Sequence, residues 1–128
     1  MLEIDKFSRV PIYEQIIAQL ERHIRLGTFA PEQPLPSVRV LSVSVGVNPN
    51  TLQKAYAELE RRSLCFSVPG SGRFVSRNAQ TLLMLRSQKR REELGTLLSE
   101  LLAAGVSRDE LHAYVDDIAD KRSGEEKI

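Results

Sequence analysis

Tryptophan is absent from this sequence, and aromatic residues make up only 5% of it. An aromatic-lined pocket is therefore not favoured, and we expect no cofactor. Cys65 is the single cysteine, which excludes a disulfide framework and a cysteine-based zinc site. No apolar run approaches the ~18 residues of a membrane span, and residues 1–6 lack the basic start and apolar block of a signal peptide. We expect a cytoplasmic protein without a membrane partner.

The side-chain groupings that perform catalysis are also missing. No nucleophile, base and orienting acid stand at a recognisable spacing, and no glycine-rich phosphate loop precedes a helix. His23 and His112 are far apart, and neither has a second ligand at helical spacing, so we expect no metal site. These absences argue against an enzyme.

Charge of one sign is not abundant either, since the net charge is +1 over 128 residues. Residues 1–78 hold ten Lys/Arg and seven Asp/Glu, whereas residues 79–128 hold eight and ten. The mild basic excess of the first part is compatible with a nucleic-acid partner but is too small to indicate one. The length allows one small domain with an appendage.

Helix signals dominate the first part of the chain. Pro11 suits the first position of a helix, where no N–H partner is needed, and Gly27 suits the residue after a helix. Between them, one stripe of apolar residues has helical spacing: Ile12, Ile16, Ile17, Leu20 and Ile24. We predict a helix from Pro11 to Leu26, followed by an ordered loop over residues 28–36, which contain three prolines.

Two more helices follow this loop. Ser37 is a good N-cap for a short helix over residues 37–44, and Gly46 breaks the helical pattern after it. Asn48 then caps a longer helix that ends near Ser63. The apolar face of this third helix comprises Leu52, Ala55, Tyr56 and Leu59.

A β-hairpin is predicted next. Strand-like runs over residues 64–68 and 73–76 flank a glycine-rich turn over residues 69–72. A short helix, a turn containing glycine, a longer helix and a hairpin together form the pattern of a winged helix-turn-helix. We therefore predict a mainly helical fold with a small hairpin, in which residues 1–77 form a DNA-binding domain.

The remaining residues, 78–128, are rich in leucine. We expect a long amphipathic helix that ends at Gly105, a second helix that begins with a capping box at Ser107 and Glu110, and a frayed tail over 121–128. Two such helices cannot bury their apolar faces on each other alone, so we expect a homodimer joined by a helical bundle. The expected dimerisation residues are Leu82, Leu85, Leu94, Leu97, Leu98, Leu101, Leu111, Val115 and Ile118.

The third helix carries the residues expected to contact DNA. Its first turns contain five polar residues: Asn48, Asn50, Thr51, Gln53 and Lys54. Amides and hydroxyls suit base edges, and a helix N-terminus favours phosphate. The alternative interpretation is that Asn48 and Thr51 cap the helix and that the other three form a solvated face.

Two more segments extend this prediction. Arg39 follows the cap Ser37 in the first turn of the short helix, where the helix dipole disfavours a cation. An external phosphate explains it better than the alternative, an exposed arginine paired with a nearby acid. In the hairpin, Gly70 and Gly72 allow close backbone approach to DNA, and Arg73 adds a cation at the tip. A plain hairpin turn is the alternative.

Residues 11–75 resemble the winged helix-turn-helix of the GntR family of bacterial transcription regulators. The resemblance rests on the segments PIYEQI (11–16), LG (26–27), LPSVR (35–39), GVNPNT (46–51), AYAELE (55–60) and GSGRFV (70–75). The Asn-Pro-Asn-Thr segment and the short helical C-terminal part look like the YtrA subgroup. Members of that subgroup often regulate operons that encode ABC transporters.

The resemblance implies a repressor that binds a palindromic, double-stranded operator as a homodimer. By position, Arg39 would contact phosphate or a groove, the start of the third helix would lie at the major groove, and Gly72 would approach the minor groove. Many members have arginine where this chain has Pro49 and Gln53, so their guanine contacts are not implied here. A small-molecule effector would have room only at the dimer interface. The alternative is a winged-helix module that binds protein instead of DNA.

Overall fold

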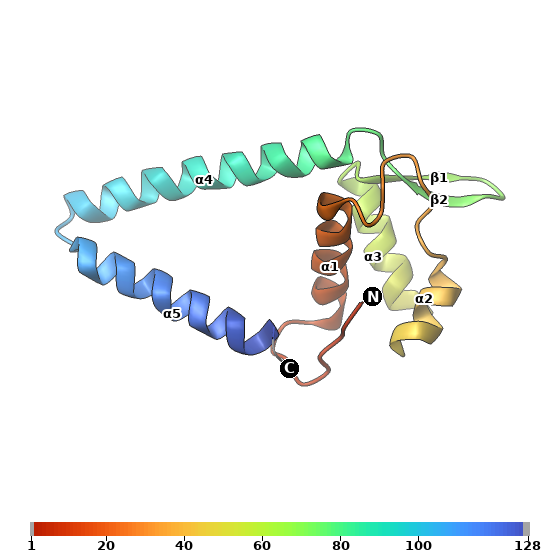
Figure 1. Ribbon diagram of the computed structural model, residues 1–128, viewed down its shortest axis with the longest axis horizontal. Helices are drawn as coiled ribbons and strands as arrows, with labels where there is room; N and C mark the ends of the chain where they lie inside the picture. The colour runs from red at the N-terminus through yellow and green to blue at the C-terminus, as the bar shows by residue number, and fades with distance from the viewer. Residues whose placement is uncertain (1, 127–128) are drawn as a thin grey trace. The chain divides into compact units, whose positions relative to one another are not determined.

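The computed structural model describes residues 2–126. Figure 1 labels its five helices and one two-stranded antiparallel sheet. In chain order these are α1 (Ile12–Leu26), α2 (Val38–Val45), α3 (Pro49–Arg61), β1 (Cys65–Val68), β2 (Gly72–Val75), α4 (Ala79–Ala103) and α5 (Arg108–Glu126). This order confirms the predicted winged helix-turn-helix, in which β1, β2 and their turn form the wing. Within residues 2–126, no helix combines the length and apolar character that crossing a bilayer requires.

The chain forms two compact units, one ending at Leu85 and one beginning at Arg86. The sequence placed this boundary at residue 78. The observed boundary lies further along the chain than the predicted one because α4 begins inside the first unit, where Ala79 and Leu83 are buried in the core. The first two turns of α4 therefore help to hold the first unit together.

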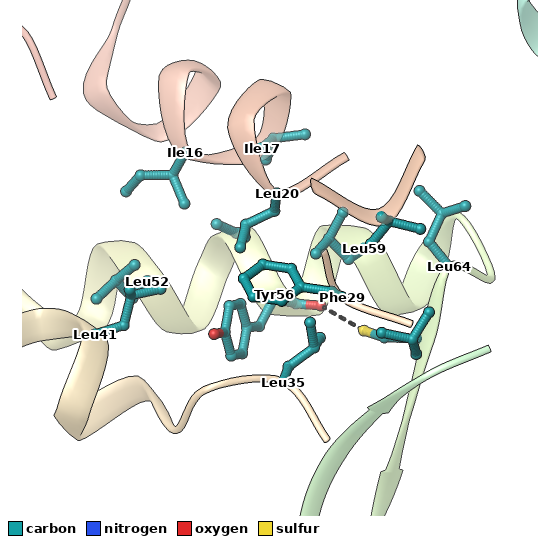
Figure 2. Packing of buried hydrophobic residues seen from close by; sticks show 14 of the residues in the cluster. Ile16, Ile17, Leu20, Phe29, Leu35, Leu41, Leu52, Tyr56, Leu59 and Leu64 are labelled. Carbon is teal, nitrogen blue, oxygen red and sulfur yellow. Dashed lines mark hydrogen bonds between the residues drawn. The ribbon is translucent and has the colours of Figure 1, made fainter. Parts of the chain in front are cut away.

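The core of the first unit is built from one stripe of α1 and one stripe of α3. The buried residues of these stripes are Ile16, Ile17, Leu20 and Ile24 of α1 and Leu52, Ala55, Tyr56 and Leu59 of α3. Figure 2 shows Ile16, Ile17 and Leu20 of α1 facing Leu52, Tyr56 and Leu59 of α3, with Leu35 and Leu41 packed near α3. Both predicted stripes are confirmed. Each large apolar side chain buried here contributes about 1.5–3 kcal/mol to folding.

The helix ends agree with the predicted residues, with two differences. Pro11 has ψ of 144°, an extended value, so it precedes α1 as its N-cap and is not the first helical residue. Helix α3 ends at Arg61, before the predicted Ser63, because Ser63 has φ of 63° and turns the chain towards β1. The predicted stop at Gly27 is confirmed by its left-handed φ of 82°.

The proline-rich loop before α2 is ordered, as predicted, and it also pairs with the wing. The Leu35 amide donates to the Arg73 carbonyl at 2.8 Å, and the Val75 amide donates to the Gln33 carbonyl at 2.9 Å. The loop thus lies along the free edge of β2, which connects the wing to the start of α2.

The second unit contains most of α4 and all of α5. The start of α5 shows half of the predicted capping box, since Ser107 Oγ accepts from the Glu110 amide at 3.1 Å. The Glu110 carboxylate accepts instead from the Tyr114 hydroxyl at 3.0 Å. Helix α5 continues through the predicted frayed tail as far as Glu126, and fraying of that tail stays a prediction. Residues 127–128 lie outside the described part of the chain.

Candidate nucleic-acid interface

The turn between α2 and α3 is fixed by side-chain caps and one glycine. Ser37 Oγ accepts from the Val40 amide at 3.1 Å, and Asn48 Oδ1 accepts from the Asn50 amide at 2.8 Å. Gly46 ends α2 with φ of 68°. The predicted caps at Ser37 and Asn48 are confirmed. Capping uses only the oxygen of the Asn48 amide, so its NH2 group keeps its donors.

One exposed polar surface lies at the start of α3, and we call it the α3 face. It comprises Asn48, Asn50, Gln53 and Lys54, which are exposed, and Thr51, which is half-buried. Residues three and four apart are neighbours on a helix, so these side chains form a continuous surface. They offer hydrogen-bond donors and acceptors beside the partial positive charge of the helix N-terminus.

Two cations, Arg39 on α2 and Lys54 on α3, have no acidic partners among the described side chains. Arg39 and Lys54 are exposed, and neither makes an ion pair with a described side chain, that is, within residues 2–124. This excludes, for the described residues, the alternative in which Arg39 pairs with a nearby acid. A positive group without an internal partner remains available to an external anion.

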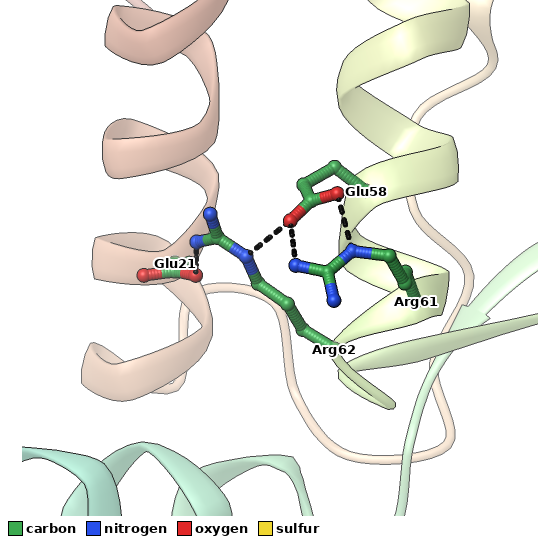
Figure 3. A network of polar contacts seen from close by, with 4 residues as sticks. All are labelled: Glu21, Glu58, Arg61 and Arg62. Carbon is green, nitrogen blue, oxygen red and sulfur yellow. Dashed lines mark hydrogen bonds and ion pairs between the residues drawn. The ribbon is translucent and has the colours of Figure 1, made fainter.

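At the other end of α3, carboxylates hold the arginines (Figure 3). Glu58 Oε1 accepts from Arg61 Nη2 at 2.5 Å and from Arg62 Nε at 2.9 Å. Arg62 Nη1 also lies 2.6 Å from Oε1 of the buried Glu21 on α1. The hydrogen bonds from Arg61 and Arg62 lower the pKa of Glu58 from 4.5 to about 2. This network joins α1 to α3 and is therefore structural.

The wing differs from its prediction in the place of its cation. Gly70 and Gly72 are exposed, with φ of 78° and 101°, as a tight turn requires. Arg73, predicted at the tip, belongs to β2, and its guanidinium lies against α3. Arg73 Nε donates to Glu60 Oε1 at 2.8 Å, and Arg73 Nη1 donates to Gln53 Oε1 at 3.0 Å. The predicted place at the tip is wrong because turn chemistry does not show where a long side chain is held, whereas a contact of Arg73 with DNA stays a prediction.

Tyr56 has a role beyond the predicted one in the core. Its hydroxyl donates to the Pro36 carbonyl at 2.6 Å, and the Arg73 guanidinium lies 5.3 Å from the centre of its ring. Burial raises the pKa of Tyr56 to about 12, so the hydroxyl stays protonated. Tyr56 thus ties the entry of α2 and the wing to α3.

A hollow of about 590 Å³ lies beside the α3 face, lined by Tyr13, Thr51, Lys54, Ala57, Glu58 and Arg61. Tyr13 comes from the start of α1 and was not among the predicted site residues. Its only signal in the sequence is its place in the PIYEQI segment. The hollow extends the α3 face towards α1.

The predicted dimerisation residues have different environments. Leu82 packs against the core of the first unit, unlike the rest of the set. The others are the exposed Leu85, Leu94, Leu97, Val115 and Ile118, the half-buried Leu98 and Leu101, and the buried Leu111. In the second unit, a hollow of about 390 Å³ is lined by Leu98, Leu102, Arg108, Leu111, His112, Val115 and Asp116. Much apolar surface of the second unit is therefore uncovered.

Cys65 is free and buried. Its Sγ donates to the Tyr56 carbonyl at 3.8 Å, and burial raises its pKa to about 11. Among the side chains that the structure describes, those of residues 2–124, no group of three or more His, Cys, Asp or Glu could hold a metal ion.

The model of the bacterial regulatory proteins of the gntR family matches residues 12–75. The HTH-type transcriptional repressor YtrA of Bacillus subtilis (strain 168) is 40% identical over 97% of this chain and 97% of its own length. A GntR family transcriptional regulator from Listeria monocytogenes has a TM-score of 0.64 at 30% identity, covering 89% of this chain and 98% of that one. The AraR DNA-binding domain in complex with operator ORE1 has a TM-score of 0.52 at 30% identity, covering 57% and 89%.

These comparisons cover both parts of the chain, since the match to YtrA extends well beyond the wing. They confirm the predicted family, and that family consists of regulators and not of enzymes. With its winged helix-turn-helix and its short helical C-terminal unit, this chain belongs to the GntR family of bacterial transcription regulators.

Proposed function

We propose that this protein is a sequence-specific repressor that binds a palindromic operator as a homodimer. The observation that carries the proposal is the α3 face, a row of amide, hydroxyl and ammonium groups on an exposed helix start. Arg39 lies on α2, which packs against α3, and has no acidic partner among the described side chains. A surface of this kind matches a duplex, which presents base edges between two rows of phosphates.

In this proposal the start of α3 enters the major groove, which is wide enough for a helix. Asn50, Thr51 and Gln53 contact base edges, together with the NH2 group of Asn48. Phosphates are bound by Lys54 and Arg39, beside the cap Ser37. The wing tip, Gly70 and Gly72, lies at the minor groove. The related AraR DNA-binding domain was solved in complex with an operator, which supports DNA binding by this fold.

A second copy of the chain would cover the apolar surface of the second unit. Leu94, Leu97, Leu98 and Leu101 follow a helical spacing along one face of α4, and α5 repeats the same spacing from Leu111 to Ile118. Exposed apolar faces of this extent mark an interaction site. A two-fold homodimer would present two α3 faces to the two halves of a palindromic operator.

Repression and the target rest on relatives. The relative YtrA is named a repressor, and the resemblance to its subgroup favours an operon that encodes a transporter. A regulator lowers transcription when its operator overlaps the promoter. The DNA upstream of the protein's own gene is therefore the first target to test.

The test is a gel shift of the full-length protein with that upstream DNA at two salt concentrations. We expect a specific shift that weakens as salt rises, because phosphate contacts release counterions. Arg39→Ala should weaken binding roughly tenfold and lower the salt slope by about one. Arg22→Ala is the matched control, because Arg22 is exposed on α1 and makes no ion pair with a described residue.

Two results would argue against this function. A shift that is equally weak with every duplex and insensitive to Arg39→Ala would mean that the α3 face does not recognise an operator. No shift at either salt concentration would favour the alternative, a winged-helix module that binds protein.

A further inference from the structure

The guanidinium of Arg73 is held by three separate contacts. Its Nε donates to Glu60 Oε1 at 2.8 Å, its Nη1 donates to Gln53 Oε1 at 3.0 Å, and it stacks over the Tyr56 ring. The side chain is only 23% exposed. Arg73 is therefore better placed to act on its neighbours than to reach for a phosphate.

Glu60 is the anchor of this arrangement. The same Oε1 atom also accepts a hydrogen bond from the Ser67 hydroxyl on β1. The bonds from Ser67 and Arg73 lower the pKa of Glu60, so it remains a carboxylate at neutral pH. The carboxylate fixes the direction of the Arg73 guanidinium, which then fixes its remaining partner, Gln53.

Arg73 determines which way the Gln53 amide faces. An arginine carries only donors, so the Gln53 atom that faces Nη1 must be the carbonyl oxygen and not the NH2 group. The NH2 group of Gln53 has no hydrogen-bond partner among the described residues, and the side chain is exposed on the α3 face. Gln53 therefore presents donors outwards, while its oxygen faces the Arg73 guanidinium and gives it one of its two lone pairs.

This orientation matters for base recognition. A glutamine pairs with adenine by using its oxygen and its NH2 group together. Guanine, in contrast, presents two acceptors side by side in the major groove, N7 and O6, and no donor beside them. An amide that turns its oxygen towards Arg73 and its NH2 group outwards thus suits the two acceptors of guanine better than the acceptor and donor pair of adenine.

We propose that Arg73 is a positioning residue that makes Gln53 select guanine over adenine in the operator. This inference rests on the proposed DNA-binding function, and it assigns a specificity to one position of the α3 face. Arg73 acts through Gln53 and does not itself contact the base. Glu60 is a second positioning residue, because its carboxylate holds the Arg73 guanidinium.

The test is selection of duplexes from a randomised pool by the full-length protein, followed by sequencing. Comparison with Gln53→Ala identifies the operator position that Gln53 contacts, because that position loses its preference. We expect guanine there with the original chain. Arg73→Met frees the Gln53 oxygen, so the guanine-to-adenine ratio at this position should fall about tenfold, with the rest of the half-site unchanged.

Arg61→Met is the matched control. Like Arg73→Met it removes an ion-paired arginine, but Arg61 lies at the end of α3 and makes no contact with Gln53. It should keep the guanine-to-adenine ratio. Thermal unfolding verifies that each variant folds. If Arg73→Met does not fold, Glu60→Gln carries the test, with a smaller shift in the same direction because Arg73 is held less firmly.

Adenine at the Gln53 position with the original chain would overturn the inference but not the DNA-binding function. So would an Arg73→Met variant that loses affinity for all duplexes equally and keeps its base preference, because Arg73 would then be a phosphate contact. A chain that enriches no sequence at all would overturn the DNA-binding function, and the inference with it.

Discussion

The arginines at the C-terminal end of α3 are each held by a carboxylate, and this pairing separates structural cations from available ones. Arg62 joins the buried Glu21 of α1 to Glu58 of α3. Removing one partner of such a pair leaves a poorly solvated charge, which is destabilising. Arg39, without a carboxylate among the described residues, contributes little to folding and keeps its charge for a partner.

Glu58 makes stability depend on acid pH. Its pKa is lowered from 4.5 to about 2 in the folded chain, so its contribution is present above about pH 4.5 and is lost as pH falls towards 2. Glu58→Gln removes this contribution. Urea unfolding of both proteins should give free energies of unfolding that differ at pH 6 and converge near pH 2.

Low salt is needed for that comparison, because the Arg61 side chain is 72% exposed and its interaction with Glu58 is screened. A difference between the two proteins that stays the same from pH 6 to pH 2 would contradict this account of Glu58.

At the scale of the element, one side chain at the start of α3 has a structural role and a proposed functional one. Asn48 Oδ1 caps α3 through the Asn50 amide at 2.8 Å, while its NH2 group belongs to the α3 face. Helix capping and DNA contact can be separated, because aspartate supplies the capping oxygen but not the NH2 group.

Asn48→Ala should lower the free energy of unfolding by about 1 kcal/mol, because the cap is lost. Asn48→Asp should keep the stability, since a carboxylate also suits the helix N-terminus, but it should weaken operator binding by repelling phosphate. Chemical denaturation and gel shifts measure the two effects. Operator binding by Asn48→Asp at the original affinity would mean that Asn48 does not lie near the DNA.

At the scale of the whole molecule, the two units differ in how far their apolar side chains are buried. The first unit has a closed core that includes Ala79 and Leu83 of α4. The second unit leaves Leu97 about 51% and Val115 about 64% exposed. We therefore expect the second unit to carry dimerisation.

A chain truncated after Leu85 should keep the fold of the first unit, sediment as a monomer and bind the operator far more weakly. The chain is truncated after Leu85, because truncation at residue 78 would remove the core residues Ala79 and Leu83. In the full chain, Leu97→Glu should also give monomers, whereas Thr96→Glu, on the opposite side of α4, should not. Sedimentation equilibrium measures each, and a dimeric truncated chain would refute this role of residues 86–128.

The sequence by itself determined the order of elements and the α3 face. Local signals were sufficient, because caps such as Ser37 and Asn48, the stop at Gly46 and the apolar stripes each act within a few residues. The resemblance of residues 11–75 to the GntR family determined the family.

Only the tertiary structure decided the features that join distant segments. In the structure, the start of α4 is buried in the core of the first unit, and the proline-rich loop pairs with β2. The Arg73 side chain, on β2, contacts Gln53 and Glu60 of α3. Contacts between residues far apart in the chain leave no periodic signal in the sequence. The direction of a long charged side chain depends on which partner the fold brings within reach, so the Arg73 contacts that orient Gln53 could not be predicted from the sequence.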